Sequence, residues 1–402
     1  MTAAELLQAL VAIPSVSGDE GRIADTVSGW AEGWGARVQR QGHNVWFSVG
    51  SGPRRLLVNS HLDTVKPCAG WTYEPHAPVW REDRLYGLGS NDAKGCVTGM
   101  LLAARTLLAE GAPTGAEVVF AFTAEEETGG QGLGTLLPKL GPLDAAIVGE
   151  PTSLKPCTAQ RGMLLLRCTA HGKSAHVAHA HATEAVNAIH LAATDIAVLA
   201  ALRFPSHPLL GEARAQVTQV SGGLARNQVP DQCEFFVDLR TTPGMEHAMV
   251  ARQVAGALKS EVKVHSERYL PKATSAEQPI VRAAVAASGA QPVGSSTASD
   301  WAFLGDLPAV KVGPGDTLRS HRRTNSSPGR SWKPAPPSTR NWFGVTSRRR
   351  LVADTLWGKG LPWTRPSTAS RWATTRWWTW RWRRMTRSGR PRTRGCWRAW
   401  AC

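Results

Sequence analysis

Four short apolar runs of this chain end in the same way, in acidic or histidine side chains. The first, RRLLVNSHLD, ends in His61 and Asp63, and the second, AEVVFAFTAEEE, ends in three consecutive glutamates. The third, DAAIVGEPT, reaches Glu150, and the fourth, LPAVKVGPGDTLRSH, runs out to His321. Apolar runs of this length, separated by helix-like segments, are typical of parallel strands that are buried on both faces. The pattern predicts a sheet whose strands share one polar edge.

The segments between these runs have the spacing of helices. GCVTGMLLAARTLLAEG, residues 95–111, places apolar residues three and four apart and ends in glycine. The N-terminal segment MTAAELLQALVAIPSVSGDE is predicted to be an amphipathic helix and not a secretion signal, because Glu5 interrupts its apolar stretch. Strands that alternate with helices predict an α/β fold with a mixed, mostly parallel sheet and helices on both faces. In such sheets, ligands bind beyond the carboxyl ends of the strands.

The pattern changes between about residues 157 and 272. RGMLLLRCTAHG, ARAQVTQVSGG and DQCEFFVDLRTT are typical of strands with one polar face, and ATEAVNAIHLAATDIAVL and EHAMVARQVAGALKS are typical of helices. This mixture predicts a small α+β dimerisation or lid domain, residues 157–272. It would be inserted into a catalytic, metal-binding domain that is formed by residues 1–156 and 273–322.

The charge of the chain is divided unevenly. The formal net charge is +16, yet residues 323–402 hold 17 Arg and 2 Lys with one acid, Asp354, so the first 322 residues are slightly acidic. The basic charge therefore does not indicate nucleic-acid binding by the body of the protein. No apolar run approaches the ~20 residues of a membrane span. Seven cysteines without a paired spacing favour a reducing compartment, and we expect a cytoplasmic protein without membrane or nucleic-acid partners.

The polar edge of the predicted sheet would collect many ionisable side chains, namely His61, Asp63, Asp92, Glu125, Glu126, Glu150 and His321. Several carboxylates in one partly buried cleft are unfavourable unless cations compensate them. Each residue alone has an ordinary explanation: Asp92 could cap the following helix, and the glutamate run could be a solvated turn. Together, at strand ends of one sheet, histidine and carboxylate side chains predict a site for two divalent metal ions.

Five segments resemble the motifs of one family, the dinuclear-zinc acylases that include acetylornithine deacetylase, succinyl-diaminopimelate desuccinylase, aminoacylases and glutamate carboxypeptidases. SHLDTV resembles the HxDxV segment of this family, LYGLGSNDAKG its GxxDxKG segment, TAEEETGG its double-glutamate segment and VGEPT its fourth motif. GDTLRSH is similar to the segment with the last histidine. The resemblance covers about residues 1–322 and implies a metal-dependent amide hydrolase.

The resemblance also implies which side chains hold the metal ions. The implied ligands of two zinc or cobalt ions are His61, Asp92, Glu126, Glu150 and His321. Asp92 would bridge the two ions. His61 and Glu150 would complete the coordination of one ion, and Glu126 and His321 that of the other.

Five further residues receive catalytic or substrate-binding roles from the same resemblance. Glu125 would be the general base, and Asp63 would hydrogen-bond the first ligand histidine and fix its tautomer. His176, in GKSAH, matches the histidine that reaches the active site of the partner subunit, which implies a homodimer. Asn227 and Arg240 match positions that bind the α-carboxylate of the substrate.

The motifs leave the substrate open among related acyl-amino acids. NDAKG stands where many deacetylases have Asp-Met-Lys-Gly, so N-acetylornithine and N-acetylcitrulline are both candidates, each giving acetate and a free amino acid in arginine biosynthesis. A desuccinylase or a dipeptidase of the same family is the alternative. A catalytically silent binding homologue would be a function of another class, and it is disfavoured because every implied ligand is present.

The last 80 residues have a composition of their own, with 11 of the 17 tryptophans. Arginine and tryptophan together could bind nucleic acid, but TTRWWTWRWRR shows no periodicity. Back-translated into GC-rich codons and read two bases later, the segment from Arg322 gives Pro-Asn-Glu and then a helix-like stretch, which the family has after its last histidine. We therefore interpret residues 323–402 as an out-of-frame, disordered tail.

Overall fold

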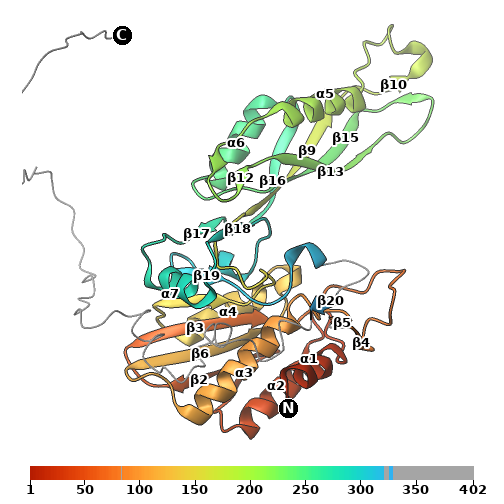
Figure 1. Cartoon of the computed structure of the whole chain (residues 1–402). Coiled ribbons are helices and arrows are strands. Elements are labelled where there is room, and N and C mark those ends of the chain that lie inside the picture. Colours follow the sequence, from red (N-terminus) through yellow and green to blue (C-terminus); the bar gives the residue numbers. More distant parts are fainter. Residues whose placement is uncertain (83, 321–325, 329–402) are drawn as a thin grey trace, which may run out of the picture. The chain divides into compact units, whose positions relative to one another are not determined.

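The computed structural model describes residues 1–82, 84–320 and 326–328 (Figure 1). One predicted metal ligand, His321, lies outside the described residues, as does nearly all of the predicted out-of-frame tail, residues 323–402. Three residues of that tail, 326–328, are described, and they pair with residues 84–86. The interpretation of the tail stays a prediction.

Nine strands of the described part of the chain form one large sheet. Its central strands β6, β3, β7 and β19 run parallel, and antiparallel pairs flank them on both sides. The order is β1-β2-β6-β3-β7-β19-β8-β17, with β18 beside β8. The strands are β1 (Gln39–Gln41), β2 (Asn44–Gly50), β3 (Arg54–His61), β6 (Ala116–Thr123), β7 (Ala145–Val148), β8 (Cys157–Gln160), β17 (Lys272–Ala273), β18 (Val293–Ser295) and β19 (Ala309–Lys311). The predicted mixed, mostly parallel α/β sheet is confirmed.

Helices cover both faces of this sheet because successive strand residues point to opposite sides. On β6, Phe120 and Phe122 belong to a core to which residues of α2 (Gly21–Gly33), α3 (Lys94–Glu110), α7 (Pro279–Ser288) and the N-terminal helix also belong. Val119 and Ala121 of the same strand belong to the core on the other face, with α4 (Gln131–Leu140). Figure 1 shows α2 and α3 side by side along the sheet.

Two helices that the sequence predicts are present in the structure. The N-terminal helix α1 (Ala3–Val11) starts at Thr2, whose backbone N–H donates to Oε2 of Glu5 at 2.8 Å while its hydroxyl accepts the Glu5 N–H. Helix α3 ends at Gly111, which has a φ of 86° that a residue with a side chain rarely adopts. Within the described ranges, no helix is both long and apolar enough to cross a membrane.

A second, antiparallel sheet is formed by residues that lie between the strands β8 and β17 in the sequence. Its order is β13-β15-β9-β16, with β9 (Met163–His171), β13 (Ala215–Gly222), β15 (Gln232–Leu239) and β16 (Glu261–Tyr269). Alternate residues of β15, among them Phe235 and Val237, join the helices α5 (Ala188–Ala201) and α6 (His247–Ala257) in a separate hydrophobic core. The boundaries predicted for the inserted domain enclose this sheet, and the division into domains stays a prediction.

Three smaller groups of strands complete the described structure. β10 (Ala175–His176) pairs with β14 (Gln228–Val229), and β11 (Ser206–His207) pairs with β12 (Gly211–Glu212). β5 (Arg84–Tyr86) pairs with β4 (Val79–Arg81) and with β20 (Ser326–Pro328), which contains the three described residues of the predicted tail.

Candidate metal centre and glutamate turn

The carboxyl ends of three parallel strands meet at one edge of the large sheet. β3 ends at His61, and β7 ends at Val148, two residues before Glu150. β6 ends at Thr123, just before residues 125–127, which we call the glutamate turn. β3 lies between β6 and β7, and His61 is in register with Thr123. The order of the strands therefore brings together ionisable side chains that are far apart in the sequence.

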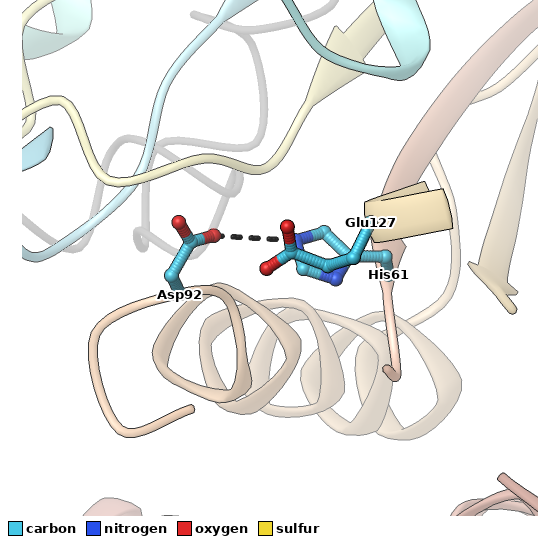
Figure 2. A group of neighbouring side chains, drawn as sticks. All are labelled: His61, Asp92 and Glu127. Atoms are coloured by element: carbon cyan, nitrogen blue, oxygen red, sulfur yellow. Dashed lines mark hydrogen bonds and ion pairs between the residues drawn. The ribbon is translucent and has the colours of Figure 1, made fainter. Parts of the chain in front are cut away.

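One group of side chains in the described residues has the geometry of a metal site. His61, Asp92 and Glu127 offer ligand atoms that all lie within 4.8 Å of one another (Figure 2). Nε2 of His61 is 3.2 Å from Oδ1 of Asp92 and 4.0 Å from Oε1 of Glu150. Asp92 does not cap α3, because Ala93 is the N-cap residue and its position carries no side-chain cap.

The structure places a residue in this group that the sequence analysis did not assign. Glu127, not the predicted ligand Glu126, completes the three-residue group with His61 and Asp92. The sequence signal for this was the run of three glutamates, which does not indicate which of them faces the other ligands. Figure 2 shows the Glu127 carboxylate beside the His61 ring, opposite Asp92. The general-base role of Glu125 stays a prediction.

The Asp63 carboxylate holds the backbone of the glutamate turn in place. Its Oδ1 accepts the backbone N–H of Glu126 at 3.1 Å, and its Oδ2 accepts that of Glu127 at 3.0 Å. Oδ2 also accepts a hydrogen bond of 2.6 Å from the Ser17 hydroxyl. Burial alone would raise the pKa of Asp63, but the hydrogen bond and the charge of His61 outweigh it and lower that pKa. A carboxylate held in this way stays ionised and orients the turn.

The same aspartate orients His61. Nδ1 of the ring lies 3.1 Å from the Asp63 carbonyl oxygen and 3.3 Å from its Oδ1, so in the neutral ring the proton belongs on Nδ1. The lone pair of Nε2 then faces Asp92, where a metal ion would bind. Burial favours the neutral ring, yet Asp63 and Asp92 together raise the pKa of His61 well above its usual range. The cluster of carboxylates therefore attracts positive charge.

Two further glutamates near the group have raised pKa values, as expected where several carboxylates lie close together. Burial raises the pKa of Glu150 to about 8; Asp92 adds to the shift, and the ammonium of Lys311 opposes it. Burial also raises the pKa of Glu126 well above its usual range, although His61 opposes the shift. Lys311 is fully buried, and its Nζ donates to the carbonyl of Thr297 at 3.1 Å. The positive charge of Lys311 opposes the shift at Glu150 but does not cancel it, so the pKa of Glu150 stays raised.

These residues fit a divalent metal ion. The donor set of one imidazole and several carboxylates is one that zinc and similar ions bind. Buried carboxylates with raised pKa values lack compensating charge, which a divalent cation would supply. His61 already has the tautomer that a ligand needs, because its Nδ1 faces Asp63. Asp92 lies at the N-terminal end of α3 with its carboxylate facing the His61 ring (Figure 2).

The chain just before the predicted ligand His321 is held beside Asp92. The side-chain amide of Asn91, the neighbour of Asp92, donates to the Asp316 carbonyl at 3.1 Å and to the Ser320 hydroxyl at 3.2 Å. Its carbonyl oxygen accepts the Asp316 backbone N–H at 2.9 Å. Residues 316–320 therefore end next to the metal group, and His321 itself lies outside the described residues.

The predicted substrate-side residues lie in two places in the segment between β8 and β17. His176 is in β10 and Asn227 directly precedes β14, and the two segments are joined by a hydrogen bond of 3.0 Å from the Val177 N–H to the Asn227 carbonyl. Arg240 follows β15 and makes a two-point ion pair with Asp238, at 2.8 and 3.0 Å. The structure thus brings His176 and Asn227 together and gives Arg240 a partner within its own segment.

More than half of the chain matches a known family. Residues 57–327 match peptidase family M20/M25/M40, and the matched segment contains the metal group, the glutamate turn and Glu150. The chain belongs to this family. As an M20-family protein it is a hydrolase, and the family resemblance inferred from the five sequence motifs is confirmed.

Individual relatives of this M20-family chain agree with that assignment. It is 28% identical to acetylornithine deacetylase of Edwardsiella ictaluri, over 79% of this chain and 90% of the relative. It is 29% identical to succinyl-diaminopimelate desuccinylase of Xanthomonas campestris pv. campestris, over 75% of this chain and 86% of the relative. Among solved structures, aminopeptidase PepT of Bacillus cereus has a similar fold, with a TM-score of 0.69 at 20% identity over 87% of this chain and 98% of PepT.

Proposed function

We propose that this M20-family hydrolase cleaves the amide bond of an N-acetyl-L-amino acid and releases acetate and the free amino acid. N-acetylornithine and N-acetylcitrulline are the proposed substrates, and arginine biosynthesis in the cytoplasm is the proposed setting. The observation that carries the proposal is the group of His61, Asp92 and Glu127 beside a further buried glutamate, in a chain that is similar to two N-acyl-amino-acid hydrolases.

The proposed metal ligands follow the geometry of the group. His61, Asp92, Glu127 and Glu150 would hold two divalent ions, zinc or cobalt, and His321 would be a further ligand. The assignment of Glu127 replaces Glu126, because Glu127 offers its carboxylate to His61 and Asp92. Ions held there would lower the pKa of a bound water from ~15.7 towards ~7 and polarise the carbonyl of the substrate.

With Glu127 as a ligand, Glu126 becomes the stronger candidate for the general base. It is the immediate neighbour of the ligand, and its backbone is held on one side by Asp63 and on the other by Tyr269, whose hydroxyl donates to the Glu126 carbonyl at 3.0 Å. The base takes a proton from the attacking water and returns it to the leaving amine, a role worth roughly 10²–10⁴-fold in rate. Glu125 is the alternative base.

His176 would donate a hydrogen bond to the oxyanion in the active site of a partner subunit. Its Nδ1 accepts the backbone N–H of Ala178 at 3.2 Å, so the proton of the neutral ring resides on Nε2. The side chain is exposed, so Nε2–H is available as a donor to another chain. This proposal requires a homodimer, and sedimentation equilibrium of the purified protein would measure the oligomeric state that it needs.

A panel of substrates tests the proposed reaction. The purified chain, loaded with Zn²⁺ or Co²⁺, is assayed for amine release from N-acetylornithine, N-acetylcitrulline, N-succinyl-diaminopimelate and a dipeptide. We expect the highest kcat/KM with one of the two acetylated substrates and loss of activity after chelation. A preference for the succinylated substrate would favour the desuccinylase alternative, which the 29% identity to a desuccinylase supports. Preference for the dipeptide would contradict the proposal.

A further inference from the structure

Three successive backbone N–H groups of the glutamate turn donate to carboxylates from distant segments. Asp63 accepts two of them, from Glu126 and Glu127. Oε1 of Glu20 accepts the third, from Glu125, at 3.0 Å. Asp63 already has a role through its contacts with His61, whereas Glu20 has none in the proposed reaction.

Glu20 is placed as if it were a helix cap, but it does not cap its helix. It is the N-cap residue of α2, and its side chain makes no hydrogen bond to the first turn of α2. N-cap acids normally accept a backbone N–H from that turn. Its Oε1 accepts instead from the backbone N–H of Gly18 at 3.0 Å and from Glu125, 105 positions further along the chain. The carboxylate is therefore directed away from its own helix and towards the glutamate turn.

The Glu20 side chain is buried and fully engaged. Its exposed fraction is 0%, and its Oε2 lies 2.8 Å from Nδ1 of His43. A buried carboxylate is unfavourable unless hydrogen bonds and charges compensate it. The backbone donors and His43 do so here, and they hold the carboxylate in one position. Glu20 can therefore act as a rigid support for whatever it contacts.

The residue that Glu20 supports has an unfavourable backbone conformation. Glu125 has φ 57° and ψ 27°, the left-handed region that residues with a Cβ rarely adopt. Such conformations persist where the surrounding structure determines them by several contacts, and they concentrate at active sites. The hydrogen bond from the Glu125 N–H to Glu20 is one such contact. The conformation of Glu125 in turn sets the direction in which Glu126 and Glu127 leave β6.

We propose that Glu20 is a positioning residue of the active site, which holds the glutamate turn so that Glu127 faces His61 and Asp92. The proposal rests on the roles given above to Glu126 and Glu127. Asp63 supports the turn from the metal side and Glu20 from the α2 side, and neither carboxylate alone reaches all three N–H groups. Glu20 acts through the backbone of Glu125 and does not touch the substrate.

A pair of variants with side chains of similar size tests this role. Glu20→Gln keeps an oxygen that can accept the Glu125 N–H, and Glu20→Met removes it. We expect Glu20→Met to lower kcat by about 10²-fold with little change in KM, the loss that a misplaced reacting group causes. We expect Glu20→Gln to keep most of the activity. The visible absorption spectrum of the Co²⁺-loaded protein should change in Glu20→Met and stay unchanged in Glu20→Gln.

A matched control separates positioning from general stability. Asp195 is also buried and accepts two backbone N–H groups, from Lys259 at 3.1 Å and Ser260 at 2.7 Å, but it belongs to α5, which packs on the second sheet. Asp195→Leu should lower the melting temperature while leaving the Co²⁺ spectrum and kcat unchanged. If Glu20→Met does not fold, Glu20→Asp takes its place, because it keeps the charge and withdraws the carboxylate by one methylene.

The outcomes decide the proposal in either direction. Wild-type kcat and an unchanged Co²⁺ spectrum in Glu20→Met or Glu20→Asp would overturn it. An equal loss of kcat in Glu20→Met and Asp195→Leu would also overturn it, because the effect would then follow stability alone. The Co²⁺ spectra do not depend on the acyl substrate, so they test Glu20 even if the wild-type chain hydrolyses none of the proposed substrates.

Discussion

Oδ1 of Asp92 lies 3.2 Å from Nε2 of His61, although 31 positions separate the two residues in the sequence. The contact exists because β3 ends where α3 begins, so the last residue of a strand meets the residue before the N-cap of a helix. Glu127 reaches the same point from the neighbouring strand β6. The metal group is therefore formed by the ends of elements that meet at one edge of the sheet. Substitutions of these side chains should weaken metal binding more than they destabilise the fold.

The glutamate turn should separate metal binding from proton transfer. Glu127→Gln weakens the ligand set, and we expect the protein to lose metal on dialysis against a weak chelator. Glu126→Gln should retain the metal and lower kcat by roughly 10²–10⁴-fold, the usual contribution of a general base. Metal content by elemental analysis and kcat on the preferred substrate measure the two effects. Glu125→Gln is the matched control, and the assignment is reversed if it, and not Glu126→Gln, abolishes turnover.

Asp63→Asn should weaken metal binding without removing a ligand. The asparagine side chain offers one oxygen where Asp63 accepts from both Glu126 and Glu127, and its amide group would oppose one of these donors. Changes in groups that orient metal ligands typically lower metal affinity by about 10–100-fold. Competition with a chromophoric chelator measures the affinity. Ser17→Ala removes one hydrogen bond to the same carboxylate and should have a much smaller effect; equal affinities of Asp63→Asn and the wild type would contradict the prediction.

The cysteines should differ in how readily they are alkylated in the native protein. Burial raises the pKa of Cys168 to about 12 and that of Cys157 to about 11, whereas Cys68 is exposed. Only the thiolate reacts, and a raised pKa keeps these two buried thiols protonated at pH 8. At pH 8, iodoacetamide should therefore label the exposed Cys68 and leave Cys157 and Cys168 unlabelled until the protein unfolds. Peptide mapping by mass spectrometry identifies each site, and rapid labelling of Cys168 in the native protein at pH 8 would contradict this view of its core.

The gene should contain a shift of reading frame near codon 322. Read two bases later, the segment from Arg322 gives Pro-Asn-Glu and a helix-like stretch. Resequencing codons 320–325 would reveal a lost base, and a frame-restored chain should melt at a higher temperature than the present chain because it regains a closing helix. An intact frame in the gene would refute this prediction. Strong, sequence-selective DNA binding by the present chain would instead support a nucleic-acid function for residues 323–402.

Local patterns in the sequence were sufficient to predict the main strands and helices. The apolar run of β6 and the helical spacing of α3, with its glycine at position 111, predict elements that the structure contains. The alternation of β15, where Phe235 and Val237 are buried, likewise predicts a strand with one covered face. These features depend on neighbouring residues alone, which is why periodicity reveals them.

The sequence was sufficient to predict the site residues that lie at strand ends. It was not sufficient to predict which glutamate of the glutamate turn faces them. His61, Asp92 and Glu150 follow from their positions at the ends of strands and the start of a helix, because such positions meet at one edge of a parallel sheet. The choice among Glu125, Glu126 and Glu127 does not follow, since a turn can present any of three consecutive side chains. Arg240, predicted to bind substrate, has Asp238 as an ion-pair partner two residues earlier, and side-chain pairing of this kind depends on the local strand geometry.

The sequence by itself determined the family, the parallel sheet and the set of acids and histidines from which a metal site could be made. Tertiary structure decided which glutamate faces His61 and Asp92. That decision depends on hydrogen bonds from the backbone of the glutamate turn to Asp63 and Glu20, which lie 63 and 105 positions away from their donors. A local pattern carries no information about partners at such separations, and only the folded chain brings them within 3.1 Å.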